Sequence, residues 1–389
     1  MKRKLLIIML IGGIIGFTSC MKDNDEKEKE ILNYVQNITS PTTLTADKRW
    51  YVEGYVNVNS DLIIEPGTVI KFKENASLHI GNGSYGSLQA LGSDDKPILF
   101  TSAAILPSPG DWDGIFFYDK NSASATNMTY CIFEYGGNSC SDYDYAAMIE
   151  VFSTDIKMTN CTVQKAACKG IYLDEYSEFV VFNNNTIKEC ETHLMELSAT
   201  AAGTIGVNNT FTTDRPFGIM ISSSTVSTSV IWKKQSTPYY TKGWIMIYGN
   251  NAFLTIQPGI TIKILSDGVF DIGYEGGKLV ASGTATEPIT FTSASNSPSK
   301  GDWNYINFGE NTTGGTILNN CIIEYGAGYS SDDEDPVIDI YSSNVTITNC
   351  TIRYNEGYGI SIWYFVSPVI RNNTYTDNNN SDVRDYNLE

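Results

Sequence analysis

The sequence predicts an all-β protein, a solenoid in which short strands wind into a parallel β-helix. Three observations predict it: a long internal tandem duplication, a shorter repeat of 24 residues, and alternating apolar runs bounded by Gly, Asn and Pro. Short strands at a fixed period of about 20–30 residues are typical of solenoids, because each coil covers the apolar side of the next. Hydrophobic residues make up 42% of the 389 residues and charged residues 18%, which is typical of a chain that folds.

The N-terminus predicts a lipoprotein signal. Three basic residues precede an apolar run from Leu5 to Phe17. That run is too short to cross a bilayer, which needs about 18–20 apolar residues. It ends at Phe17-Thr18-Ser19-Cys20, which resembles the lipobox of bacterial lipoproteins. The resemblance implies that residues 1–19 are removed and that Cys20 carries acyl chains that anchor the protein. The alternative is an ordinary secretory signal with an incidental Cys.

Residues 20–40 begin with a charge run without apolar periodicity, which predicts a solvated acidic tether. Met21 after the Cys resembles the pattern of lipoproteins released to the outer membrane, and the acidic stretch resembles an export signal for the cell surface. The net charge of −18 argues against a nucleic-acid partner, which would favour a basic surface. The expected partners are therefore the membrane, through the N-terminal lipid, and a glycan or protein ligand. We expect a monomer.

The duplication divides one continuous solenoid into a first copy, residues 41–237, and a second copy, residues 238–389. Their order is kept and their spacing changes only by single residues. The matching segments are Ile63–Lys71 with Thr255–Lys263, Pro97–Ala103 with Pro288–Ala294, Gly110–Trp112 with Gly301–Trp303, Cys131–Gly136 with Cys321–Gly326, and Thr159–Thr162 with Thr348–Thr351. The repeated Gly-Asp-Trp tryptophans are expected to pack at a corner of the coil under a loop.

Asparagines recur at the ends of the short strands, including Asn160, Asn184 and Asn208, one coil apart. Asn tolerates the left-handed backbone of a tight corner and can bond to the Asn of the coil above or below. We therefore expect ladders of Asn at the corners, and place Asn185 and Asn373 at matching corners of the two copies.

The remaining cysteines are expected mainly in the core. Cys131 matches Cys321, and Cys161 matches Cys350, at inward-facing positions where a free thiol acts as a small hydrophobic group. The other three, Cys140, Cys168 and Cys190, have no counterpart in the second copy, and one disulfide among them would suit an oxidising compartment.

With its Pro-Gly turns and Asn-Cys-Thr corners, the chain from about residue 41 to 389 resembles right-handed parallel β-helices of the pectate-lyase-like superfamily. The alternative fold is a pair of β-sandwiches, which does not explain the short period. The resemblance implies that polysaccharide lyase or hydrolase activity is a candidate function. However, arginine is scarce, and the Asn-Thr-Asp, Asp-Asp and Gly-His-Gly signatures of polygalacturonase-like enzymes are absent.

Two acidic loops at equivalent places in the copies are candidate calcium sites. Clustered carboxylates can supply several of the 6–8 oxygen ligands that Ca²⁺ takes. The alternative is a pair of solvated loops. The candidate ligands are Asp142, Asp144, Asp332, Asp333, Glu334 and Asp335. No other cofactor is expected.

Three consecutive aromatic residues, Trp363, Tyr364 and Phe365, are the candidate ligand-binding residues. They cannot all point inward from one strand, so part of the patch should be exposed, and exposed aromatics often mark a binding surface. The first copy has Asp174, Glu175 and Tyr176 at the matching loop. The alternative is a cap over the C-terminal end of the solenoid.

Two functions therefore stay open. The first is a non-catalytic, lipid-anchored surface protein that binds a glycan or a protein along one face. The second is a polysaccharide lyase or glycoside hydrolase whose catalytic residues the sequence does not identify. Two or more carboxylates with a Lys or Arg, converging in a groove across three coils, would favour the second.

Overall fold

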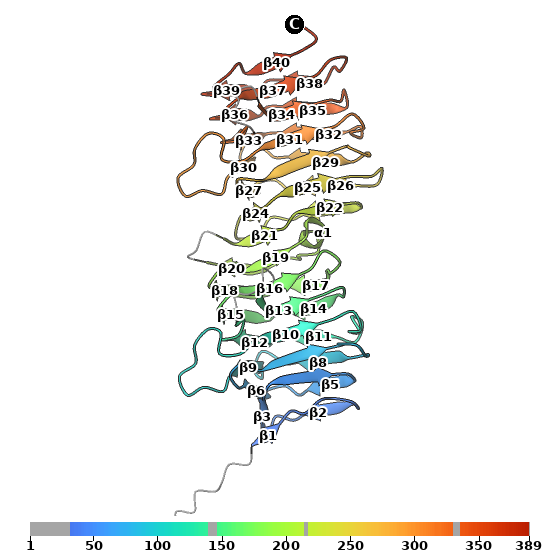
Figure 1. The fold of residues 1–389 in the computed structure, drawn as a ribbon, viewed down its shortest axis with the longest axis vertical. Coiled ribbons are helices and arrows are strands. Elements are labelled where there is room, and N and C mark those ends of the chain that lie inside the picture. Colours follow the sequence, from blue (N-terminus) through green and yellow to red (C-terminus); the bar gives the residue numbers. More distant parts are fainter. Residues whose placement is uncertain (1–31, 139–145, 214–216, 330–334, 389) are drawn as a thin grey trace, which may run out of the picture. The chain divides into compact units, whose positions relative to one another are not determined.

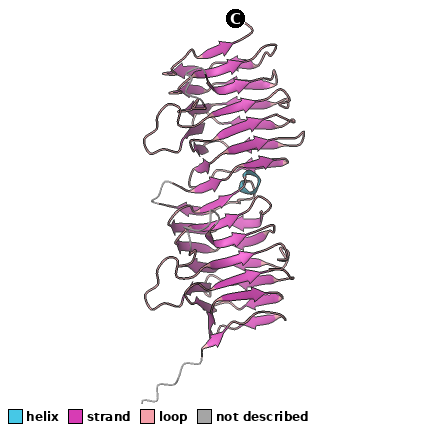
Figure 2. Ribbon diagram, viewed as in Figure 1, coloured by secondary structure: helices cyan, strands magenta, loops and turns pink. Residues whose placement is uncertain are grey.

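The computed structural model describes residues 32–138, 146–213, 217–329 and 335–388. From Asn33 onward the chain is a stack of coils with strands on its sides (Figure 1). Strands dominate the structure, and α1 (Ala199–Ala202) is the one helix among the described residues (Figure 2). Within the described residues no helix could therefore span a membrane.

The strands form five sheets, named A to E here, and neighbouring strands within each sheet are parallel. Sheet A contains β1 (Asn33–Tyr34), β3 (Arg49–Val52), β6 (Val69–Phe72), β9 (Ile98–Ser102), β12 (Cys131–Glu134), β15 (Thr162–Ala166), β18 (Thr186–Cys190) and β20 (Thr210–Thr212). Sheet B contains β4 (Tyr55–Val58), β7 (Ser77–Ile80), β10 (Gly114–Phe117), β13 (Ala147–Val151), β16 (Lys169–Leu173), β19 (Met195–Leu197), β21 (Ile219–Ile221), β24 (Tyr239–Thr241), β27 (Thr261–Ile264), β30 (Ile289–Ser293), β33 (Cys321–Glu324), β36 (Thr351–Arg353) and β39 (Thr374–Thr376).

The other three sheets are shorter. Sheet C contains β2 (Thr42–Leu44), β5 (Asp61–Ile64), β8 (Ser87–Leu91), β11 (Asn127–Thr129), β14 (Ile156–Thr159) and β17 (Phe179–Asn183). Sheet D contains β22 (Ser224–Val226), β25 (Trp244–Ile247), β28 (Val269–Ile272), β31 (Tyr305–Phe308), β34 (Pro336–Ile340), β37 (Tyr358–Ile362) and β40 (Val383–Asp385). Sheet E contains β23 (Ser229–Trp232), β26 (Phe253–Ile256), β29 (Lys278–Ser282), β32 (Thr316–Asn319), β35 (Val345–Thr348) and β38 (Val369–Arg371).

The two copies are displaced by one sheet around the coil. The matching strands β6 and β27 lie in sheets A and B, β7 and β28 lie in sheets B and D, and β8 and β29 lie in sheets C and E. The displacement arises in the middle of the chain, where α1 follows β19, sheet A ends at β20 and sheet D begins at β22. Outward-facing residues that match between the copies therefore lie on different sheets.

Several contacts hold this junction together. The Ser198 hydroxyl caps α1 by accepting from the Ala201 N–H. The Ala199 N–H donates to Ser224 Oγ at 2.9 Å, and the Trp232 indole N–H donates to the Ala199 carbonyl at 2.8 Å. The short helix is thus bonded to the first strands of sheets D and E.

Apolar side chains from the sheets fill the interior in stacks one coil apart. Phe100 lies between Phe72 and Phe133, with ring centroids 6.5 and 4.6 Å away. Trp112 and Trp303 are fully buried, and their indole N–H groups donate to the carbonyls of Glu134 and Glu324. This confirms that the repeated tryptophans are structural corners.

The core thiols stack as expected. Cys131 and Cys161 are neighbours on successive coils of the first copy, as are Cys321 and Cys350 in the second, and all four are buried and free. Their thiols donate to backbone carbonyls, Cys131 to Ala90 and Cys321 to Ala281, both at 3.3 Å. Cys190 is also buried and free. Cys168 is disulfide-bonded. Cys20 and Cys140 themselves lie outside the described residues.

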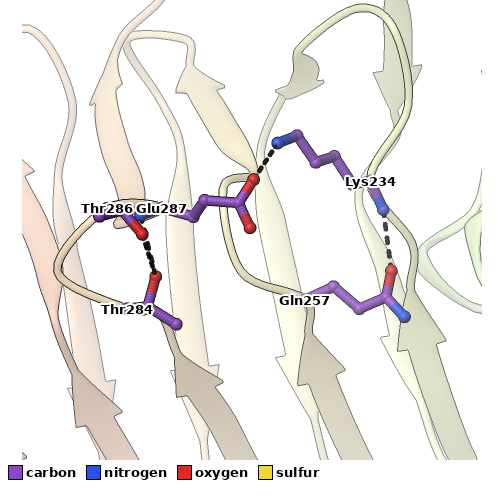
Figure 3. A network of polar contacts seen from close by, with 5 residues as sticks. All are labelled: Lys234, Gln257, Thr284, Thr286 and Glu287. Atoms are coloured by element: carbon purple, nitrogen blue, oxygen red, sulfur yellow. Dashed lines mark hydrogen bonds and ion pairs between the residues drawn. The ribbon is translucent and has the colours of Figure 1, made fainter.

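Exposed turns between coils carry polar contacts as well. Lys234 Nζ lies 2.8 Å from Glu287 Oε1, and the Lys234 backbone N–H donates to Gln257 Oε1 (Figure 3). The hydroxyl groups of Thr284 and Thr286 are hydrogen-bonded to each other. Both charged side chains are about half exposed, so this ion pair contributes only about 0–1 kcal/mol. The stability of the solenoid comes mainly from its buried stacks.

The structure divides the two roles that the sequence assigned to the corner asparagines. Asn160, Asn184 and Asn208 take the left-handed backbone, with φ of 55–58°, and the residues that follow two of them, Asn185 and Asn209, make the bonds between coils. Asn185 Oδ1 accepts from the Cys161 N–H at 2.9 Å, and Asn185 Nδ2 donates to the Met158 carbonyl at 3.0 Å. The Asn185 N–H in turn donates to Asn209 Oδ1 on the next coil. In the second copy Asn373 accepts from the Cys350 N–H at 2.9 Å. The matched corners are therefore built alike.

Asn185→Ala should lower the free energy of unfolding by about 2–4 kcal/mol, because it leaves a buried N–H and a buried carbonyl without partners. Urea denaturation at pH 7 measures the effect. The matched control is Asn296→Ala, at an exposed loop position of the second copy, and it should unfold like wild type. Equal midpoints for the two variants would contradict a stabilising ladder.

Candidate functional site

The outer face of sheet D carries a row of polar side chains in register. Asp271, Asn307, Asp339, Ser361 and Arg384 pair from one strand to the next. Their chain neighbours Phe270, Ile306, Ile338 and Ile360 are fully buried. Because successive side chains of a strand point to opposite faces, this row faces away from the core. Asn307 Nδ2 donates to Asp271 Oδ1 at 2.7 Å, which orders one end of the row.

Aromatic side chains flank this row on both sides. On one side Trp363 is stacked between Tyr341 and Tyr386, with ring centroids 4.8 and 4.7 Å away. On the other side Tyr305 and Tyr329 meet edge to face at 5.4 Å. Together they enclose a pocket of about 460 Å³ on the second copy, which we call the aromatic pocket. It is lined by Tyr305, Tyr329, Asp335, Pro336, Asp339, Tyr341, Ser361, Trp363, Arg384 and Tyr386.

The pocket shifts the pKa of the Asp339 carboxyl group. Burial raises its pKa to about 6, although the Trp363 indole N–H, which donates to Asp339 Oδ1 at 2.6 Å, and Tyr341 both favour the ionised form. Burial, followed by the charge of Asp339, raises the pKa of Tyr341. The carboxyl group therefore exchanges its proton close to neutral pH, within reach of a bound molecule.

Arg384 supplies positive charge to the pocket. Its guanidinium lies 4.5 Å from the ring centroid of Tyr386 and 5.2 Å from that of Tyr358, which are cation–π distances. The pocket thus combines aromatic edges, hydroxyl groups, carboxyl groups and one guanidinium. Such a set can contact the apolar faces of a sugar and hydrogen-bond its hydroxyls.

The family "Pectate-lyase like beta helix domain" matches residues 36–151 and 224–316, and "Right handed beta helix region" matches residues 113–231 and 286–385. The chain belongs to the pectate-lyase-like, right-handed β-helix family. No curated protein and no solved structure gave a match.

In this right-handed β-helix protein the predicted aromatic patch divides into two parts. Trp363 lines the pocket, but both faces of its ring are covered by tyrosines. Tyr364 and Phe365 lie outside the pocket and are 51% and 98% exposed. The exposure that the sequence predicts is therefore confirmed, and a role in ligand binding stays a prediction. The turn itself is held by Asn387, which accepts from the Phe365 N–H at 2.7 Å.

Of the six candidate calcium ligands, the described residues include only Asp335, which lines the aromatic pocket. Asp142, Asp144, Asp332, Asp333 and Glu334 lie outside the described residues. Within the described ranges no group of three or more His, Cys, Asp or Glu side chains is placed to hold a metal ion. Calcium binding by the two loops stays a prediction.

The first copy of the β-helix has diverged at the matching positions. Glu150 on β13 corresponds to Asp339, and burial raises its pKa to about 8. Tyr172 stands where the second copy has Ser361, and Glu196 stands where it has Arg384. The matching face of the first copy thus places an acid where the aromatic pocket has its guanidinium, so the two faces differ in chemistry.

Sequence reasoning missed Tyr305, Tyr329, Asp339, Tyr341 and Arg384. They come from separate coils and form no local motif. The signal that could have found them is the coil register, because outward positions one coil apart become neighbours on a sheet.

Proposed function

We propose that this protein is a lipid-anchored, surface-exposed β-helix protein that binds a glycan in the aromatic pocket. The observation that carries the proposal is the pocket itself, a concave site that spans four strands of sheet D, β31 to β40. Its volume suits a short oligosaccharide segment better than a protein surface, because protein interfaces are wider and flatter. Aromatic rings beside carboxyl and guanidinium groups match the mixed apolar and hydroxyl surface of a sugar.

Tyr329→Ala should weaken glycan binding about tenfold, because an exposed aromatic wall of the pocket is lost. Tyr329 is 62% exposed, so the fold should tolerate its removal. Retention is measured on bacterial, plant and host glycans. The matched control is Tyr176→Ala, which removes a 72% exposed tyrosine of the first copy. If no glycan is retained by wild type, or if both variants retain it equally, the pocket is not the binding site.

A second function is favoured by one specific observation. Asp335 just before β34, Asp339 on β34 and Arg384 on β40 all line the pocket, and Asp339 has a pKa of about 6. A carboxyl group that titrates near neutral pH can act as a general acid or base. If the protein is a polysaccharide lyase or glycoside hydrolase, incubation with the retained glycan should yield shorter products, and Asp339→Asn should stop their formation. An unchanged glycan would favour binding alone.

Membrane fractionation tests the proposed lipid anchor at Cys20. Cys20→Ala should move the protein from the membrane fraction to the soluble or secreted fraction of its native host, because the site of acylation is lost. Ser19→Ala keeps the cysteine and should stay with the membrane. If Cys20→Ala remains in the membrane fraction at wild-type levels, the lipoprotein proposal is wrong.

A further inference from the structure

The loop that joins β9 to β10, residues 103–113, exposes two large aliphatic side chains at its tip, and we call it the apolar loop. Ile105 is 98% exposed and Leu106 is 86% exposed. The loop projects sideways from the stack of coils, as does the matching loop between β30 and β31 (Figure 1). From Ser102 to Gly110 it contains no charged residue. Two adjacent aliphatic residues so fully exposed lose the stabilisation that burial would give.

The loop is held in shape by polar contacts at its base. Ser102 Oγ donates to Asp111 Oδ2 at 2.5 Å, and the Ser108 N–H donates to the same oxygen at 3.0 Å. The Asp111 N–H donates to the Tyr135 carbonyl at 3.0 Å. None of these bonds involves the side chain of Ile105 or Leu106, so the shape of the loop does not depend on them.

The second copy provides an internal comparison. Its loop has the same base, in which Ser293 Oγ and the Ser299 N–H donate to Asp302 Oδ2 at 2.6 and 2.9 Å. At the positions of Ile105 and Leu106 it carries Asn296 and Ser297. The same loop therefore forms with a polar tip. The apolar tip of the first copy is not a requirement of folding and points to a contact outside the molecule.

The length of chain before the solenoid favours a membrane as the surface contacted. Between Cys20 and Asn33 the chain can extend at most about 45 Å. Sheet A runs β1, β3, β6, β9, so the apolar loop starts three strand spacings from the first strand, about 15 Å along the axis. The matching loop follows β30, which lies seven spacings from β10 in sheet B, about 34 Å further along. Along the axis of the solenoid, the apolar loop is thus the nearer of the two to β1, the strand that follows the tether.

We propose that Ile105 and Leu106 insert into the interfacial layer of the bilayer that carries the lipid anchor, so that the solenoid is held against the membrane by its side. This inference rests on the proposed anchoring through Cys20. The tether keeps the loop at high local concentration near the bilayer, so two aliphatic side chains suffice for a weak, reversible contact.

This inference can be tested on vesicles with a tether that does not depend on lipidation. The mature chain with Cys20→Ala and an N-terminal hexahistidine tag is held on phosphatidylcholine vesicles that contain a nickel-chelating lipid. Ala104→Cys carries an environment-sensitive dye, and brominated phosphatidylcholine quenches dyes that enter the bilayer. The free cysteines of the described core are buried and should not react. We expect at least threefold stronger quenching at position 104 than for the same dye at Ser295→Cys on the matching loop.

Adding Ile105→Asn and Leu106→Ser, the residues of the matching loop, should reduce the quenching at position 104 to the level at position 295. An unchanged melting temperature shows that this variant is folded. Equal quenching with and without Ile105 and Leu106, or none in either protein, would overturn the inference. Because the tag replaces the lipid, this outcome is independent of the Cys20→Ala fractionation that tests the anchor itself.

Discussion

Glu196→Ala should lower the free energy of unfolding by about 3–5 kcal/mol, because it removes one partner of a buried ion pair. Glu196 Oε2 lies 2.9 Å from Lys169 Nζ, and the two side chains are only 4% and 9% exposed. Lys242 Nζ lies 2.6 Å from Glu196 Oε1, and the Ser222 hydroxyl donates to the same oxygen at 2.6 Å. These residues form the Glu196 cluster, and removing the carboxylate removes both ion pairs and the hydrogen bond from Ser222.

The same cluster predicts a dependence on pH. Burial alone would raise the pKa of Glu196, but Lys169 and Lys242 outweigh it and lower the pKa to about 2. A carboxylate with a lowered pKa contributes stability that is present above its unfolded value of 4.5 and is lost as the pH falls towards 2. Urea denaturation at pH 7 and pH 3 measures this loss. Glu310→Ala, at an exposed position, is the control, and a Glu196→Ala variant as stable as that control would contradict the prediction.

Glu150→Gln should have the opposite effect and stabilise the protein at alkaline pH by about 3–5 kcal/mol. Glu150 is 5% exposed, and burial raises its pKa from 4.5 to about 8. The folded state therefore keeps a proton that the unfolded state has lost, so the stability of wild type falls as the pH rises from about 4.5 to 8. Glutamine carries no such charge and keeps an oxygen for the Ala147 N–H, which Glu150 Oε1 accepts at 3.0 Å.

Denaturation at pH 5 and pH 9 tests this difference. At pH 5 the variant should resemble wild type, and at pH 9 it should be the more stable protein. The matched control, Glu310→Gln, should change neither value. If wild type and Glu150→Gln show the same dependence on pH, Glu150 is not the buried acid that the structure indicates.

The sequence predicted the repeating parts of this fold well, because matching coils carry the same residue pattern. The Asn corners, the stacked thiols and the buried Gly-Asp-Trp tryptophans all lie where their repetition indicated. The displacement of the copies by one sheet could not be predicted in this way. It depends on α1, a four-residue helix after β19, and on the end of sheet A at β20, neither of which leaves a repeated pattern.

The sequence singled out two of the residues that line the pocket, Asp335 as a candidate calcium ligand and Trp363 as a candidate ligand-binding residue. Trp363 stands out because it begins a run of three aromatics, whereas Tyr305 and Arg384 are single residues on distant coils. They become neighbours through the pairing of β31, β34, β37 and β40, a register that no local motif encodes. The run of aromatics also did not predict that Trp363 is stacked between Tyr341 and Tyr386, so that both faces of its ring are covered.

Hydrogen–deuterium exchange with and without the glycan that wild type retains tests the central claim, binding at the aromatic pocket, most directly. Backbone amides exchange more slowly where a ligand restricts local opening. Occupation of the pocket predicts glycan-dependent protection in β34 (Pro336–Ile340), β37 (Tyr358–Ile362) and the segment around Tyr329, and none at the matching first-copy strands β13 and β16. Protection confined to the first copy, or exchange unchanged by a glycan that is demonstrably bound, would contradict it.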